Sequence, residues 1–182
     1  MNNKVYMGID PGKKGGIAIR FKYRHDIKFW KMPKFEKDTF LLIEKLNKKY
    51  KILNCVIEKA QAFPGNGVVA MFNYGQGFGF LIGVVTALRI PIDFVRPTIW
   101  QKNIMQGVPK KGYKTKERAY IAACNLFPKH FLVDDHENIL ETYEEWEDVE
   151  LDEGYKAPKK TEDGIIDAIL ISEYTKRMNN EI

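Results

Sequence analysis

The stretch Val5-Tyr6-Met7-Gly8-Ile9-Asp10-Pro11-Gly12 decides how the rest of the sequence is interpreted. Its first five residues are apolar and suited to a β-strand, and the strand is expected to end at the carboxylate of Asp10. Pro11-Gly12 then predicts a turn. A carboxylate embedded in apolar sequence loses hydration on burial, so it needs a cation or hydrogen-bond donors. Asp10 is therefore the first candidate for a functional residue.

Working outward from this strand, the pattern predicts both strands and helices. Strands are expected at 17–21, 27–32, 52–58 and 91–95, and helices at 36–50, at about 68–89, from Pro97, at 114–127 and at 161–177. Three strands separated by short connections come first, and helices alternate with strands afterwards. This order predicts an α/β fold with a mixed five-stranded sheet flanked by helices. The strand at 52–58 is mostly apolar, which favours a central position.

Two other carboxylates interrupt apolar sequence in the same way. Glu58 ends Leu53-Asn-Cys-Val-Ile-Glu, and Asp167 interrupts the apolar run of the last helix. Adjacent strand ends converge at one edge of a sheet, and Asp163 lies four residues before Asp167 on the same helical face. Four such oxygen ligands suit Mg²⁺ or Mn²⁺, and two ions roughly 4 Å apart would support phosphodiester hydrolysis. Each of these residues also has an alternative structural role. Asp10 could form a turn, Glu58 could form an ion pair with a Lys, and Asp163 could be an ordinary acidic residue in the first turn of a helix.

The charge distribution indicates a polyanionic partner. The chain has 182 residues and a net charge of +5, but eleven of its 24 acidic residues lie at 134–153, where there is no Lys or Arg. The other 162 residues carry 29 basic and 13 acidic side chains, a net charge of +16. Nucleic acid is the first candidate partner, and a soluble body with a separate acidic loop is the alternative. We expect a single domain, 1–182, with an acidic insertion at about 130–160.

Several classes of protein are disfavoured by the sequence. The longest apolar stretch, Phe80–Leu88, is about half of what crosses a bilayer, and no charged-then-apolar leader opens the chain. We therefore expect a cytoplasmic protein with no membrane partner. Cys55 and Cys124 both lie in apolar segments, so a disulfide framework or thiolate metal cluster is not expected.

The ordered set of motifs resembles the RuvC-like Holliday junction resolvases, and most of all the phage and other small members of that group in the ribonuclease H-like superfamily. The resemblance lies in Gly8-Ile9-Asp10-Pro11-Gly12 with Gly15-Gly16, in Val56-Ile57-Glu58, and in Asp163-Gly164-Ile165-Ile166-Asp167-Ala168. Pro64-Gly65-Asn66-Gly67-Val68 and Val95-Arg96-Pro97-Thr98-Ile99-Trp100-Gln101-Lys102 add to it. It covers about 4–128 and 161–178.

The resemblance implies a homodimeric endonuclease that resolves four-way DNA junctions by paired nicking. Its cofactor would be Mg²⁺, with Mn²⁺ as a substitute, at two ions per active site. Asp10, Glu58, Asp163 and Asp167 match the four acidic ligands by position, and these four would be catalytic. The bacterial resolvases usually space the last pair three residues apart, whereas here the spacing is four. The acidic block has no counterpart in the family pattern.

The resemblance also implies a dimer interface. Gly75, Gly79 and Gly83 recur every four residues and form a smooth stripe on the long helix. In this family the equivalent helix pairs across the dimer, so the stripe is expected to lie in that interface. Close packing of the stripe on the sheet is the alternative.

Basic and aromatic side chains supply candidate DNA contacts. Loop and helix residues expected to contact phosphates are Lys13, Lys14, Arg96, Lys102, Lys110, Lys111, Lys114 and Arg118. Lys116, or else Lys114, is expected to assist catalysis near the ions. Phe63 lies where resolvases carry an aromatic that wedges into the junction, and it fits the core equally well. Trp100 and Phe72 are expected in the core.

Other functions remain open on sequence alone. Within the nuclease class, forks, flaps or Y-structures are alternative substrates, because phosphate contacts and dimer geometry set the choice. A non-catalytic DNA-binding module and an actin- or sugar-kinase-type ATPase are the alternatives from other classes. We also consider a phage-encoded origin with action in the host cytoplasm. The acidic block is hypothesised to mimic DNA charge, so that deleting 134–153 tightens binding to linear duplex at low salt.

Overall fold

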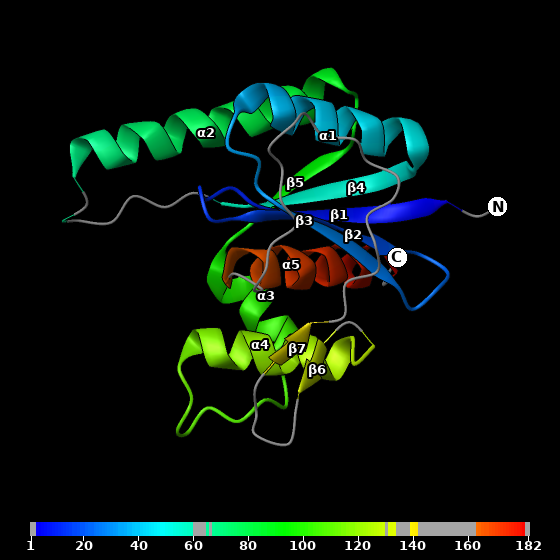
Figure 1. Ribbon diagram of the computed structural model, residues 1–182, viewed down its shortest axis with the longest axis vertical. Coiled ribbons are helices and arrows are strands. Elements are labelled where there is room, and N and C mark those ends of the chain that lie inside the picture. Colours follow the sequence, from blue (N-terminus) through cyan, green and yellow to red (C-terminus); the bar gives the residue numbers. More distant parts are fainter. Residues whose placement is uncertain are drawn as a thin grey trace.

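A five-stranded mixed sheet forms the centre of the computed structural model, which describes residues 3–59, 65, 67–129, 131–133, 139–141 and 163–180 (Figure 1). The strands are β1 (Lys4–Asp10), β2 (Gly16–Phe21), β3 (Ile27–Lys31), β4 (Lys51–Glu58) and β5 (Ile92–Val95), in the spatial order β3-β2-β1-β4-β5. The strand β2 is antiparallel to both β1 and β3, whereas β4 runs parallel to both β1 and β5. The predicted α/β sheet, with its mixed strand directions, is confirmed.

Helices cover both faces of the sheet (Figure 1). One face is covered by α1 (Glu36–Lys49) and α2 (Val68–Ala87), and the other by α5 (Asp163–Asn180). On that second side α3 (Pro97–Ile104) and α4 (Thr115–Leu126) pack against α5. The layered arrangement places the ends of β1 and β4 between two sets of helices.

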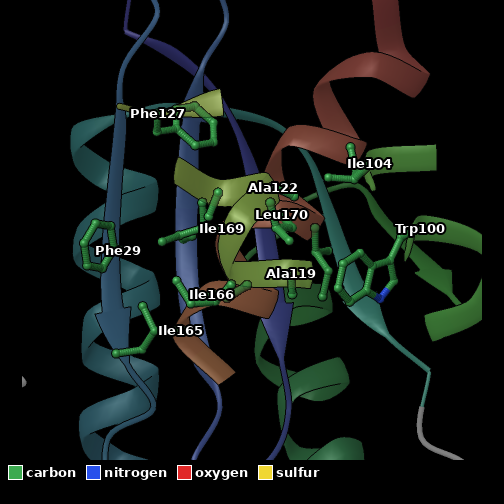
Figure 2. Close-up of a cluster of buried hydrophobic side chains, with 14 of the residues drawn as sticks. Phe29, Trp100, Ile104, Ala119, Ala122, Phe127, Ile165, Ile166, Ile169 and Leu170 are labelled. Carbon is green, nitrogen blue, oxygen red and sulfur yellow. The ribbon is translucent and has the colours of Figure 1, made fainter. Parts of the chain in front are cut away.

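Alternation along the strands decides which side chains meet which helices. In β1, Val5, Met7 and Ile9 are fully buried in the cluster beneath α1 and α2. Tyr6, Gly8 and Asp10 must point to the opposite face, because successive residues of a strand alternate between faces. A second buried cluster fills that face, where α3, α4 and α5 meet the sheet (Figure 2).

Gly8 allows α5 to lie directly against β1. A Cβ at Gly8 would lie 2.5 Å from the Ala168 carbonyl oxygen and 2.8 Å from the Ile171 carbonyl carbon, so no larger side chain fits. The Thr175 hydroxyl, two turns from Ala168, donates to the Ile171 carbonyl at 2.7 Å within α5 and lies 3.4 Å from the Met7 carbonyl of β1. The helix and the strand therefore touch backbone to backbone, which fixes the path of α5 across the sheet.

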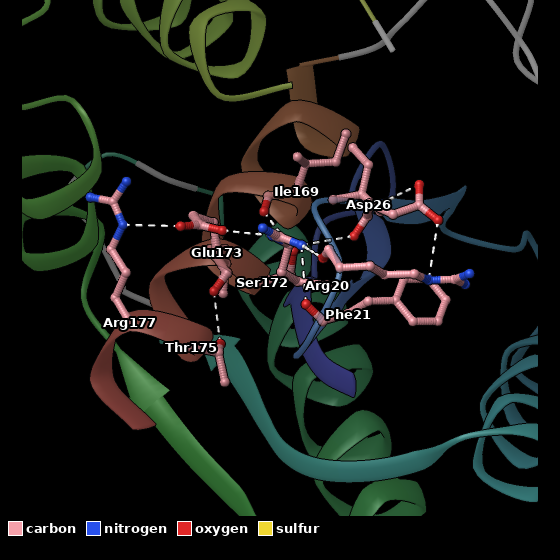
Figure 3. A network of polar contacts seen from close by, with 11 residues as sticks. Arg20, Phe21, Asp26, Ile169, Ser172, Glu173, Thr175 and Arg177 are labelled. Atoms are coloured by element: carbon pink, nitrogen blue, oxygen red, sulfur yellow. Dashed lines mark hydrogen bonds and ion pairs between the residues drawn. The ribbon is translucent and has the colours of Figure 1, made fainter. Parts of the chain in front are cut away.

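A buried polar network also fixes α5 to β2 (Figure 3). Arg20, which is 2% exposed, donates from Nε to Glu173 Oε2 at 2.8 Å. Its Nη1 donates to the carbonyls of Phe21, Arg24 and Asp26. A buried guanidinium is costly unless its donors are satisfied, and here Nε and Nη1 both have partners.

A short hairpin lies where only an acidic loop was expected. Strands β6 (Phe131–Val133) and β7 (Ile139–Glu141) pair antiparallel in a separate two-stranded sheet. Each has three residues, which is shorter than the four to eight that a periodicity argument requires to identify a strand. Most of the acidic block at 134–153 lies outside the described residues.

Among the described helices, α2 alone is long and apolar enough to span a membrane by length and composition. A single helix of this kind is weak evidence for a membrane span, because core helices of globular proteins can have the same length and composition. Its second half packs on the sheet through Leu81, Val84 and Val85, which are buried. Figure 1 shows the first half extending beyond the end of the sheet. Only 17% of the apolar segment is buried.

Candidate functional site

Asp10 and Glu58 lie at the ends of neighbouring parallel strands. The last paired residues of β1 and β4 are Ile9 and Ile57, and each carboxylate is the next residue along. Glu58 shares a face with Val56, which belongs to the cluster on the α5 side, and Asp10 shares a face with Gly8. The structure therefore brings together two of the four predicted acidic residues, on the side of the sheet covered by α3 and α5.

The Asp10 carboxylate is held by the turn that follows it. The Gly12 backbone N–H donates to Asp10 Oδ1 at 3.0 Å, which is the local hydrogen bond that Asp commonly forms at a turn. Burial raises the pKa of Asp10 above its usual value, and the Gly12 hydrogen bond opposes the shift by stabilising the charged form. The predicted turn role of Asp10 is thus real, and it orients the carboxylate.

The first turn of α5 reaches the other side of Asp10. A Cβ on Gly164 would lie 2.5 Å from the Gly15 Cα and 2.7 Å from Asp10 Oδ2. Gly15 and Gly164 also form an isolated β-bridge. Glycine at both positions lets the start of α5 approach Asp10 without a steric clash. The α5 acids therefore begin close in space to β1.

Glu58 is held by a tryptophan. The indole Nε1–H of Trp100 donates to Glu58 Oε2 at 2.7 Å. Burial raises the pKa of Glu58 to about 7, the Trp100 hydrogen bond lowers it, and the charge of Asp10 raises it further. Trp100 is completely buried, as predicted, but its hydrogen bond to Glu58 was not predicted.

Tyr74 is a site residue that sequence reasoning missed. Burial raises its pKa to about 12, and the negative charges of Asp10 and Glu58 act in the same direction. Its phenol therefore stays protonated beside the two carboxylates at neutral pH. Tyr74 shares the inward face of α2 with Phe78, Leu81 and Val85, at helical spacing. That periodicity was the available signal.

The two α5 acids are less fully described. Asp163 is the first residue of α5, and its side chain lies outside the described residues. Asp167 is half-buried one turn later. Within the described part of the chain, no three Asp, Glu, His or Cys side chains are grouped closely enough to hold a metal ion. The participation of Asp163 and Asp167 stays a prediction.

Asp10 and Glu58 nevertheless suit a divalent cation. Both are largely removed from water, and each raises the energy of the other when charged. Within the described ranges, no Lys or Arg forms an ion pair with either carboxylate. Carboxylate oxygens are the ligands that Mg²⁺ and Mn²⁺ take. The donor set fits such an ion.

The predicted DNA-contacting residues are mostly exposed. Lys13 and Lys14 lie in the turn after Asp10, and Arg96 follows β5, whose Val95 pairs with Glu58. Exposed lysines continue over α3, the loop to α4 and the start of α4: Lys102, Lys110, Lys111, Lys114 and Lys116. Figure 1 places this loop and the start of α2 on the same side of the molecule as the ends of β1 and β4.

Two predicted DNA contacts differ from this pattern. Arg118 is half-buried, and its Nε donates to the Pro109 carbonyl at 3.1 Å, so it holds the α3–α4 loop in place. Phe63 lies outside the described residues.

The predicted glycine stripe faces open space. Gly75, Gly79 and Gly83 share one face of α2 with Val68 and Phe72, and we call these five residues the outward face of α2. A Cβ at any of the three glycines would meet nothing within 4 Å, so the alternative of close packing on the sheet is wrong. Phe72 is 71% exposed and Val68 86%, so the prediction that Phe72 lies in the core is also wrong.

Comparison with solved structures identifies the fold. A structure of Thermus thermophilus RuvC in complex with a Holliday junction substrate is similar over 96% of this chain and 96% of that chain, with a TM-score of 0.58 and 15% identity. A second Thermus thermophilus RuvC structure covers the same shares with a TM-score of 0.51 and 14% identity. No protein-family model and no curated protein matches the sequence. The chain therefore has the RuvC fold, as the motifs predicted.

Proposed function

We propose that this protein is a divalent-metal-dependent endonuclease that resolves four-way DNA junctions by paired nicking. The observation that carries the proposal is the pairing of Asp10 and Glu58 at adjacent strand ends in a RuvC fold. Two like charges that are both removed from water are unfavourable without a cation between or beside them. The similar RuvC structure holds a Holliday junction substrate, which favours that class of DNA here.

Asp10 and Glu58 would hold the metal, with Asp163 and Asp167 from α5 as the further ligands. When bound, two Mg²⁺ ions would supply an activated water for attack on the phosphorus and charge stabilisation for the departing 3′ oxygen. The Gly12 N–H keeps Asp10 in one orientation. Tyr74 stays neutral, so it adds no charge that would repel a phosphate.

The exposed basic residues would bind the phosphates on either side of the cut. Lys13 and Lys14 are the basic residues closest along the chain to Asp10, and Arg96 follows Val95, the residue of β5 that pairs with Glu58. Lys116 remains our candidate for a lysine that assists the scissile phosphate. Such contacts fix the position of the DNA without selecting a sequence, and they make binding salt-dependent.

We further propose that two copies pair through the outward face of α2. Paired nicking needs two active sites, and this face carries exposed apolar side chains next to glycines that leave room for another backbone. Large exposed apolar patches on a protein of this size mark interaction surfaces. A second copy offers the same face, so the contact would be self-complementary.

Cleavage of a panel of labelled DNA substrates tests the proposal. Four-way junctions, forks, 5′ flaps and linear duplex would be incubated with the full-length protein, with Mg²⁺ or with EDTA. We expect symmetric paired nicks in the junction that need Mg²⁺. Asp10→Asn should lower the cleavage rate by well over 100-fold. Losing a residue that only hydrogen-bonds to a metal ligand typically costs about 10- to 100-fold, and Asp10 is itself a proposed ligand. Asp38→Asn, in the first turn of α1, is the matched control and should cleave normally.

The outcomes separate the alternatives. Cutting of forks or flaps in preference to junctions would keep the nuclease and reassign its substrate. Junction binding without cleavage in any divalent metal would favour the non-catalytic DNA-binding module. Cleavage that Asp10→Asn leaves intact would refute the assignment of the site.

A further inference from the structure

Trp100 and Glu58 form a hydrogen bond between residues that are 42 positions apart in the sequence. The indole Nε1 lies 2.7 Å from Glu58 Oε2, and the Trp100 side chain is completely buried. A tryptophan that only fills the core needs some partner for its N–H, and a backbone carbonyl commonly serves. Here the partner is one of the two carboxylates of the candidate metal site.

The local chain path explains how Trp100 reaches Glu58. Val95, the last residue of β5, pairs with Glu58, and the Lys59 N–H donates to the Val95 carbonyl at 2.7 Å. Pro97 then begins α3 at its first position, where its missing N–H costs nothing. One turn later the helix turns Trp100 back toward the end of β4. The indole is packed in the cluster that includes Ala119 and Leu170 (Figure 2).

The chemistry of an indole suits this position. Glu58 has several rotatable bonds, and fixing one carboxylate oxygen removes most of that freedom. The indole is a donor without a formal charge, so it orients the carboxylate and leaves its negative charge available. A lysine or arginine in its place would neutralise the charge that a metal ion needs. In the part of the chain that the structure describes, no group donates to Glu58 Oε1.

We propose that Trp100 is a positioning residue for the metal site: its indole N–H fixes Glu58 through Oε2 and leaves Oε1 for a divalent cation. The inference rests on the proposed metal-dependent activity. Groups that hydrogen-bond to metal ligands raise metal affinity by about 10- to 100-fold in other proteins, because they hold the ligand in its binding geometry. Burial of the ring keeps the donor from turning away.

Metal binding by the Trp100→Phe variant of the full-length protein tests the proposal. The matched control is Trp30→Phe, which makes the same ring change at a residue of β3 that is 2% exposed and lies in the cluster beneath α1 and α2. Titration calorimetry with Mn²⁺ should show affinity about tenfold weaker for Trp100→Phe and unchanged for Trp30→Phe. The Mg²⁺ concentration for half-maximal cleavage should rise by a similar factor, and junction binding in EDTA should not change.

A measurement on the wild-type protein tests the proposal even if Trp100→Phe does not fold. The sequence has three tryptophans, Trp30, Trp100 and Trp146, so their indole N–H signals in an NMR spectrum are assigned with Trp30→Phe and Trp146→Phe alone. Titration with Mg²⁺ should shift the Trp100 indole signal saturably and leave the Trp30 signal in place.

The two experiments separate failure of this inference from failure of the proposed function. A Trp100 indole signal that stays fixed while the Glu58 backbone amide shifts would overturn the positioning role alone. Equal Mn²⁺ affinities for Trp100→Phe and Trp30→Phe would do the same. A wild-type protein that binds no Mn²⁺ and cleaves no DNA would overturn both.

Discussion

Asp10 and Glu58 extend one residue beyond the paired Ile9 and Ile57, so that two carboxylates stand next to each other at the end of the sheet. Burial raises the pKa of both groups, and for Glu58 the pKa reaches about 7. In the protein without metal, the two carboxylates therefore repel each other at neutral pH when both are charged. A proton on one of them, or a bound cation, removes this repulsion. This relationship leads to the first prediction.

Glu58→Gln should stabilise the metal-free protein at pH 8 but not at pH 4.5. The folded pKa of Glu58 lies above its ordinary 4.5, so its favourable contribution is complete below pH 4.5 and is lost as the pH rises through about 7. Allowing for partial exposure, we expect a gain of about 1–2 kcal/mol at pH 8. Urea unfolding in EDTA at both pH values measures it. Identical curves for the two proteins at pH 8 would contradict the pKa assignment.

Gly164→Ala should destabilise the protein and impair the site. The added Cβ would lie 2.7 Å from Asp10 Oδ2 and even closer to the backbone of the β1–β2 turn, so α5 or Asp10 must move. Overpacking of this kind costs about 1–3 kcal/mol. The control is Gly77→Ala, whose Cβ meets nothing within 4 Å and which should be neutral or stabilising. Thermal unfolding and the cleavage rate at a temperature where both variants are folded provide the comparison.

Arg20→Met should destabilise the protein by about 3–5 kcal/mol, because it leaves Glu173 in a buried position without its main partner. Glu173 keeps its ion pair with Arg177, at 3.1 Å. The control is Lys48→Met, which removes the exposed pair with Glu44 on α1 and should cost under about 0.5 kcal/mol. Chemical denaturation of both variants measures the two losses in the free energy of unfolding. A loss for Arg20→Met as small as for Lys48→Met would show that the network in Figure 3 carries little stability.

Gly79→Ala should weaken the proposed dimer, although in an isolated helix the same change is favourable. Alanine stabilises a helix interior by about 0.5–1 kcal/mol over glycine. A Cβ at Gly79 meets nothing within 4 Å in one copy, but in the proposed dimer its methyl group would separate the two α2 backbones. Gly77→Ala, on a different side of α2, should give the helix gain without the loss of dimer. Sedimentation over a range of protein concentrations distinguishes the two. Equal dimer affinities for both variants would remove the outward face from the proposed interface.

The sheet and two candidate site residues, Asp10 and Glu58, could be predicted from the sequence because their signals are local. A carboxylate directly after an apolar strand is visible in a run of six residues, and parallel neighbours bring such strand ends together. Trp100 and Tyr74 were harder to assign, since their polar roles depend on partners far away in the chain. Trp100 was correctly placed in the core, but nothing around it indicates Glu58.

Two other features were missed for different physical reasons. Arg20 lies in the apolar strand Gly16–Phe21. A charged residue in apolar sequence needs a buried partner whether it is basic or acidic, so Arg20 could have been identified in the same way as Asp10 and Glu58. Phe72 was placed in the core because aromatic residues are usually buried, whereas α2 leaves it on the outward face. A helix that is apolar on all sides gives no periodicity from which to choose the buried side.

The direct contact between Gly8 and α5 has a consequence for how the protein is made. The strand that carries Asp10 is synthesised before α5, which covers it and lies more than 150 residues later in the sequence. Until α5 is made, the sheet face that it covers stays open to solvent with its apolar side chains, and such a surface favours chaperone binding or aggregation. Synthesis of α5 both covers this face and supplies Asp163 and Asp167, so a truncated product that ends before α5 lacks the cover and both of these acids.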